Sequence, residues 1–115
     1  MKKLACLFLL LTSLFLSCKK EENNNNQNQG VDCSTITYSG TIAPLVTSKC
    51  NTAGCHASGS VNGDYTGYSG LKAKFDNGSL KQRVIVEKSM PSGSSLTETQ
   101  LKQFECWINA GAPNN

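Results

Sequence analysis

The sequence predicts one small all-α domain over residues 33–115. Three observations support this fold class: a capped amphipathic stretch near the C-terminus, a short stretch with one apolar side over about residues 42–49, and further apolar residues between them. A domain of this length rarely stabilises itself on an apolar core alone, and it usually recruits disulfides, a metal or a cofactor. We therefore expect a staple or a bound group in addition to helix packing.

The C-terminal stretch gives the clearest helix prediction. Thr97 is a suitable N-cap, and Gln100 follows three residues later in a capping-box arrangement. Gly111 and Pro113 are placed to end the helix. One face is apolar at helical spacing, through Leu101, Phe104, Trp107 and Ile108.

Two further regions are predicted to be helical. The first covers about residues 42–49, with Ile42, Leu45 and Val46 on one side. One or two more short helices are expected around Leu71, Phe75, Leu80, Val84, Ile85 and Val86. Residues 84–86 are β-branched, so an extended segment leading to Met90 is the alternative there.

The first 17 residues have the pattern of a secretory signal peptide. A basic start at Lys2 and Lys3 precedes an apolar run over residues 4–16, which is too short to span a bilayer comfortably, and the small residue Ser17 follows. Residues 15–18 (Phe-Leu-Ser-Cys) resemble the lipobox of bacterial lipoproteins. That resemblance implies lipidation of Cys18 as the mature N-terminus; the alternative is a signal anchor with an unmodified Cys18.

Residues 18–32 are predicted to be a lipidated cysteine followed by a polar tether. Residues 19–30 contain no apolar side chain, so they cannot bury surface to offset the entropy cost of ordering. Glu21 and Glu22 resemble surface-export signals of some Gram-negative lipoproteins, or they are simply part of the linker. The sequence therefore predicts an exported domain anchored to a bacterial membrane, facing the periplasm or the cell surface.

Two cysteines and a histidine lie together in the segment Cys50-Asn51-Thr52-Ala53-Gly54-Cys55-His56. Thiols can add to the two vinyl groups of haem, and a histidine directly after the second cysteine is then held beneath the iron. The usual attachment motif has two residues between the cysteines, whereas this one has four, and Gly54 gives the longer loop backbone freedom. The segment predicts one covalent haem c, with thioethers at Cys50 and Cys55 and His56 as the proximal iron ligand.

Met90 is the predicted distal iron ligand. His56 is the chain's one histidine, which excludes a bis-histidine haem, and Met1 is lost with the signal peptide. A thioether is a soft ligand that favours ferrous iron. The alternative is that Met90 is an ordinary apolar core residue.

These segments together resemble the small cytochrome c-like domains of bacterial lipoproteins, some of which accompany the planctomycete-type cytochrome c group. The resemblance covers residues 33–115 and is carried by residues 43–45, 49–56, 90–91 and 107–112. It implies a helical domain wrapped around one haem, with thioether roles for Cys50 and Cys55 and iron ligation by His56 and Met90.

The remaining cysteines, Cys33 and Cys106, are predicted to form a disulfide. Cys6 is removed with the signal peptide and Cys18 takes the lipid, so two thiols are left in an oxidising compartment. Cys106 lies off the apolar stripe, so this bond would strap the N-terminal segment over the outer face of the last helix. The alternative is two unpaired thiols.

The predicted function is single-electron transfer rather than catalysis. Ligands at both axial positions leave the iron no open site, and no other residues resemble a catalytic set. One alternative is a haem enzyme or sensor in which Met90 does not bind the iron. Another is a haem-free lipoprotein in which Cys50 and Cys55 form a disulfide, or in which Cys50, Cys55, His56 and another cysteine bind zinc, although export disfavours zinc thiolates.

Charge gives a weaker indication of partners. Residues 33–115 carry seven basic and five acidic side chains, and a net charge of +2 is too small to predict nucleic-acid binding. Ahead of Met90 the basic residues outnumber the acidic ones, through Lys72, Lys74, Lys81, Arg83 and Lys88. That edge is either a docking face for an acidic redox partner or a solvated surface. The expected partners are a redox protein of unknown identity and the membrane through Cys18.

Overall fold

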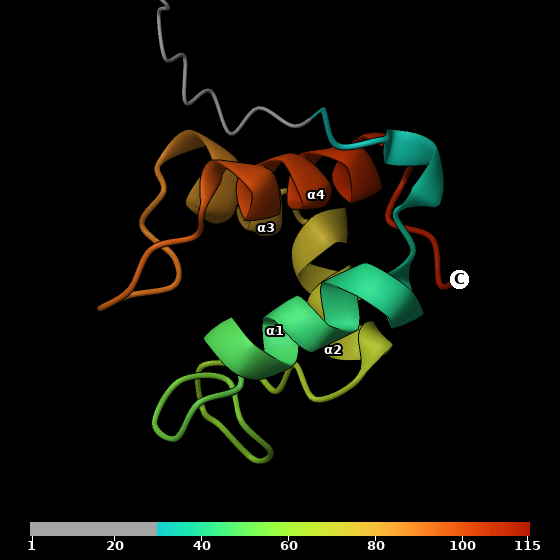
Figure 1. Cartoon of the computed structure of the whole chain (residues 1–115). Helices are drawn as coiled ribbons and strands as arrows, with labels where there is room; N and C mark the ends of the chain where they lie inside the picture. Colours follow the sequence, from blue (N-terminus) through green and yellow to red (C-terminus); the bar gives the residue numbers. More distant parts are fainter. Residues whose placement is uncertain (1–29) are drawn as a thin grey trace, which may run out of the picture.

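Four α-helices and three short helical turns form the regular structure of residues 30–115, the part of the chain that the computed structural model describes (Figure 1). The α-helices are α1 (Ala43–Lys49), α2 (Tyr68–Asp76), α3 (Ser79–Lys81) and α4 (Glu98–Asn109). No strand occurs within these residues, so the all-α prediction is confirmed for them. The predicted signal peptide, Cys18 and nearly all of the tether lie outside the described residues.

The last helix, α4, begins at the predicted cap. The Thr97 hydroxyl accepts a hydrogen bond from the Gln100 amide at 3.2 Å, and the Gln100 side chain accepts one from the Thr97 amide at 3.0 Å. The predicted capping box is therefore complete. The helix ends at Asn109, just before Gly111, whose φ of 88° an L side chain rarely adopts.

Helix α1 matches the first helix predicted over about residues 42–49, and a turn that the sequence did not predict precedes it. A π-helical turn, η2 (Tyr38–Ile42), runs directly into α1, and the Thr37 hydroxyl caps it by accepting from the Gly40 amide at 3.0 Å. A second π-helical turn, η3 (Gln82–Val86), continues α3. The β-branched residues 84–86 are thus helical rather than extended. Val84 is buried in the core, and this packing outweighs its preference for a strand.

The apolar core joins α4 to every other α-helix, since Val46 of α1, Leu71 of α2 and Leu80 of α3 are buried in the same cluster. Trp107 and Phe104 are each 1% exposed, and Leu101 and Ile108 are also buried, as the stripe predicted. The C-terminal tail folds back over this core: the Pro113 carbonyl accepts from Trp107 Nε1 at 2.9 Å, and the Asn115 carbonyl accepts from the Ser39 amide at 2.8 Å. The C-terminal tail is therefore held against both η2 and α4.

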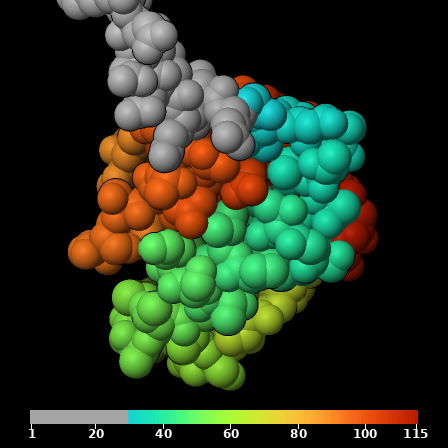
Figure 2. All heavy atoms as spheres, viewed as in Figure 1, coloured from blue at the N-terminus to red at the C-terminus, as the bar shows by residue number. Residues whose placement is uncertain are grey.

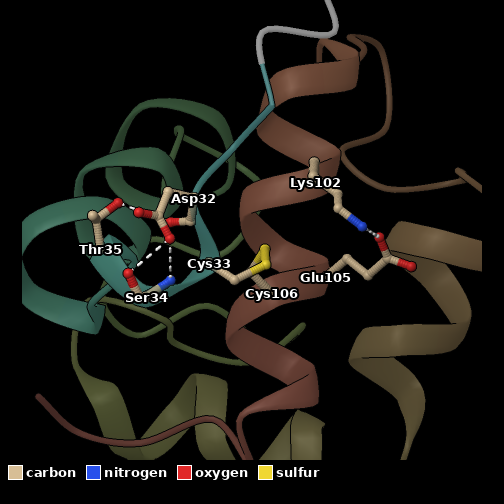
Figure 3. Close-up of a disulfide and its surroundings, with 7 residues drawn as sticks. All are labelled: Asp32, Cys33, Ser34, Thr35, Lys102, Glu105 and Cys106. Carbon is tan, nitrogen blue, oxygen red and sulfur yellow. Dashed lines mark hydrogen bonds and ion pairs between the residues drawn. A yellow bond between two sulfur atoms is a disulfide. The ribbon is translucent and has the colours of Figure 1, made fainter.

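The predicted disulfide between Cys33 and Cys106 is present and closes a sequence separation of 73 residues (Figure 3). Cys33 begins a short 3-10 turn, η1 (Cys33–Thr35), which Asp32 caps by accepting from the Ser34 amide at 2.9 Å. Cys106 is only 4% exposed, so the outer face of α4 is covered at this point, as the predicted strap requires. The covering element is the N-terminal segment itself, since η1 packs against α4.

Within residues 30–115, no helix has both the length and the apolar character needed to cross a membrane.

Candidate functional site

All four predicted haem-binding residues line one cavity of about 430 Å³. Cys50, Cys55 and His56 reach it from the loop that follows α1, and Met90 reaches it from the segment between η3 and α4. In Figure 2 the green loop after α1 and the orange segment before α4 lie on the same face of the molecule. The volume falls within the range of about 300–1,000 Å³ that is typical of small-molecule and cofactor sites.

The walls of this cavity combine apolar and cationic side chains. The apolar part comes from helices α2, α3 and α4 and their flanks, through Leu71, Leu80, Val84, Leu96 and Phe104. Lys49, Lys74 and Arg83 add positive charge, and within the described residues no acidic side chain lines the cavity. Such a lining suits a largely apolar ligand that carries negative groups at its edge.

Backbone hydrogen bonds hold the two ends of the loop from Cys50 to His56 together. Helix α1 ends where the Cys50 and Asn51 amides both donate to the Val46 carbonyl, at 2.8 and 2.9 Å. The His56 amide then donates to the Cys50 carbonyl at 3.1 Å. Gly54 has a φ of 80°, the left-handed conformation that glycine adopts readily. The four-residue spacing therefore folds into a compact turn that keeps both thiols and the imidazole at one cavity.

Cys50 and Cys55 are separate thiols, with no bond between them. Burial, aided by the nearby Cys55 thiol, raises the pKa of Cys50 to about 11, so this thiol is protonated at neutral pH. The other two cysteines of residues 30–115 are bonded to each other, and no group of three or more His, Cys, Asp or Glu side chains in that range is placed to hold a metal ion. The zinc hypothesis thus gains no ligand set from this part of the chain.

The His56 imidazole is fixed from two sides. Its Nδ1 lies 3.0 Å from the Gly63 carbonyl oxygen, and because a carbonyl only accepts, we assign the proton to Nδ1. The Tyr65 ring stacks on it with centroids 4.0 Å apart and an interplanar angle of 15°. This arrangement leaves Nε2 with its lone pair available for a metal, as in histidines whose other nitrogen is held by an outer hydrogen bond.

Tyr65 is in turn held by the motif loop. Its amide donates to the His56 carbonyl at 3.0 Å, and its carbonyl accepts from the Asn51 side chain at 3.0 Å. Neither Gly63 nor Tyr65 was predicted from the sequence to be part of the site. The Gly63 acceptor is a backbone carbonyl, which any residue has, so no residue type in the sequence could have indicated it.

Met90 is positioned by the end of the preceding helical turn. The Ser89 and Met90 amides both donate to the Arg83 carbonyl, at 2.9 and 3.2 Å. Met90 is half-buried and packs against the apolar core while it lines the cavity. The core-residue alternative and the ligand hypothesis are therefore compatible in this geometry.

Comparison of the chain with protein-family models, with curated proteins and with solved structures finds no match. Functional inference thus depends on the motif and on the cavity in which its residues meet.

Proposed function

We propose that this protein is an exported, lipid-anchored c-type cytochrome with one covalent haem, and that it transfers single electrons. The observation that carries the proposal is that two unpaired thiols, the sole histidine and Met90 all line one cavity. Met90 comes from a separate segment, 34 residues after His56 in the sequence.

The residues at this cavity fit a haem. Cys50 and Cys55 would form the thioether bonds, the free Nε2 of His56 would bind one face of the iron, and Met90 would bind the other. The apolar walls suit the macrocycle, and Lys49, Lys74 and Arg83 suit its carboxylates. Haem supplies a one-electron iron couple when bound.

The protein's own contribution is to hold the ligands and exclude competing chemistry. The Gly63 carbonyl keeps the proton on Nδ1 of His56 and makes the imidazole a stronger donor through Nε2. The Arg83 carbonyl holds the backbone of Met90 at the cavity. With both His56 and Met90 bound to the iron, no coordination position would be open to a substrate, so the proposed role is that of a carrier and not of an enzyme.

Covalent attachment is the decisive test. The full chain is expressed with a haem-maturation system and then denatured in acid and organic solvent. We expect the haem absorbance to stay with the polypeptide, and the Cys50→Ala/Cys55→Ala double variant to lose it. A wild-type chain that releases all of its haem, or never acquires any, would contradict the proposal.

The anchor is proposed on the sequence pattern that ends at Cys18, which lies outside the described residues. We expect Cys18→Ser to leave the membrane fraction or to accumulate with its leader attached. An Asn24→Ala variant changes the predicted tether, leaves residues 15–18 intact and serves as the control. A Cys18→Ser protein that is processed and stays membrane-bound would contradict lipidation.

The redox partner is proposed to be a protein with acidic groups at its contact surface. Three of the five cations on the basic edge make ion pairs: Lys72 with Asp76, Arg83 with Glu87 and Lys88 with Glu98. Lys49 and Lys74, which line the cavity, make no ion pair within residues 30–115. We therefore place the contact at the cavity opening, and expect electron transfer to slow with rising salt.

A further inference from the structure

Gly70 lies in the first turn of α2, at a point where another part of the chain touches the helix backbone. A Cβ atom at this position would lie 1.8 Å from the carbonyl oxygen of Asp64 and 3.0 Å from its carbonyl carbon. Both atoms belong to the backbone, so no side-chain rotation can relieve the overlap. Glycine is a poor helix residue, and here its use has a steric reason.

The segment that touches Gly70 is the one that holds His56. Gly63, just before Asp64, supplies the carbonyl that accepts from His56 Nδ1 at 3.0 Å. Tyr65, just after it, supplies the ring that stacks on the imidazole. A displacement of the Asp64 carbonyl therefore moves both neighbours of the imidazole at once.

The other contacts of Asp64 lie within its own loop. Its carboxylate accepts from the Gly59 amide at 3.2 Å and from the Thr66 amide at 2.8 Å. These bonds shape the loop but do not tie it to a helix. The contact at Gly70 sets how closely residues 63–65 approach α2.

We propose that Gly70 is a positioning residue for His56. Its missing side chain lets residues 63–65 lie against α2, and this places the Gly63 carbonyl in line with Nδ1 and leaves Nε2 directed to the cavity. The consequence for the iron rests on the proposed haem function, whereas the consequence for the imidazole does not.

The test compares Gly70→Ala with Gly67→Ala in the full chain. Gly67 is the N-cap of the same helix, with a φ of −130°, and a Cβ there meets nothing within 4 Å, so it is a matched control. Because His56 is the only histidine, ring-nitrogen NMR of the neutral imidazole reports on it alone. In the haem-free chain we expect wild type and Gly67→Ala to carry the proton on Nδ1, and Gly70→Ala to lose that signal in favour of the Nε2 form.

A redox measurement on the haem-loaded chain gives a second readout. Loss of the hydrogen bond to Gly63 weakens electron donation by the imidazole, so the reduction potential of Gly70→Ala should shift upward relative to both wild type and Gly67→Ala. If no variant binds haem, the proposed function fails while the NMR comparison still decides the role of Gly70.

Gly63→Ala covers the case in which Gly70→Ala does not fold. A Cβ at Gly63 would meet the Tyr65 ring at 3.2 Å, and the φ of 104° is one that alanine rarely adopts, so the carbonyl must move. We expect the same loss of the Nδ1 proton. The proposal is overturned if a folded Gly70→Ala keeps the wild-type tautomer or, should that variant not fold, if Gly63→Ala keeps it.

Discussion

Helix α4 and the loop over residues 50–66 are held in place by different forces. Helix α4 buries five side chains, has a complete capping box and is bonded through Cys106 to the start of the domain. No residue of the loop is fully buried, and the loop is shaped by hydrogen bonds among its own backbone groups and a few side chains. Helix α4 thus contributes much of the core and none of the proposed haem-binding residues. The loop carries Cys50, Cys55 and His56 and contributes little to the core.

This difference indicates how the site is built. An intramolecular hydrogen bond contributes only about 0.5–1.5 kcal/mol net, so a loop held in this way has low local stability. The helical core, by contrast, gains from apolar burial and from the disulfide. The core thus provides one wall of the cavity, through Phe104 and Leu80, and the loop provides Cys50, Cys55 and His56, the proposed haem-binding residues.

Among the variants below, replacing Met90 should have the largest effect, and that effect should be on iron ligation and not on the stability of the fold. In Met90→Ala the proposed haem should stay attached, because the thiols are intact, while the sixth position should open, since residues 18–115 contain no second methionine and His56 is the proposed ligand on the other side. We expect carbon monoxide binding to appear and the reduction potential to fall, by optical titration.

Ser92→Ala is the control, since Ser92 lines the same cavity without a ligand sulfur. An unchanged spectrum and potential in Met90→Ala would remove Met90 from the iron and favour a site with an open sixth position.

Removing the disulfide should lower the free energy of unfolding and leave iron ligation unchanged. The chain-entropy relation gives about 4 kcal/mol, as an upper figure, for a crosslink that spans 73 residues. We expect Cys33→Ala/Cys106→Ala to lose most of that free energy of unfolding in urea titrations, while the haem spectrum stays the same. The single variants Cys33→Ala and Cys106→Ala each break the bond, so each should lose a similar free energy of unfolding. Alkylation of both cysteines in the unreduced wild-type protein would contradict the bond itself.

The capping box should contribute less than the disulfide. Thr97→Ala leaves the Gln100 amide without its side-chain acceptor, and we expect a loss of about 1 kcal/mol in the free energy of unfolding. Thr99→Ala lies in the same helical turn without a capping role and should change little. Equal losses in the two variants would mean that the cap does not stabilise α4.

The smallest effect is expected on the solvated side of α2. Lys72 and Asp76 form an i,i+4 ion pair, and the Asp76 side chain is 57% exposed. Asp76→Asn should cost no more than about 0.5 kcal/mol, and the cost should vanish in high salt. A loss above that of Thr97→Ala would mean that the paired charges of α2 do more for the fold than this exposed geometry indicates.

The sequence predicted the parts of the fold that depend on local patterns. The stripe of Leu101, Phe104 and Trp107 and the cap at Thr97 are properties of a few neighbouring residues, and both are confirmed. It left residues 84–86 open between helix and strand, because β-branched residues accept either state until packing decides. The covering of the outer face of α4 at Cys106 was predicted through the disulfide to Cys33, because cysteine count and compartment identify that pair without the fold.

The sequence by itself determined which atoms are available for the proposed chemistry: the thiols of Cys50 and Cys55, one imidazole, the thioether of Met90 and the predicted disulfide pair Cys33 and Cys106. Only the tertiary structure decided that the two thiols, the imidazole and the thioether line one cavity and that a carbonyl and a tyrosine ring hold the imidazole. The physical reason is that residue type fixes chemistry. The orientation of His56, in contrast, depends on the backbone path of residues 63–65, and the close approach of that path to Gly70 is a contact between separate segments.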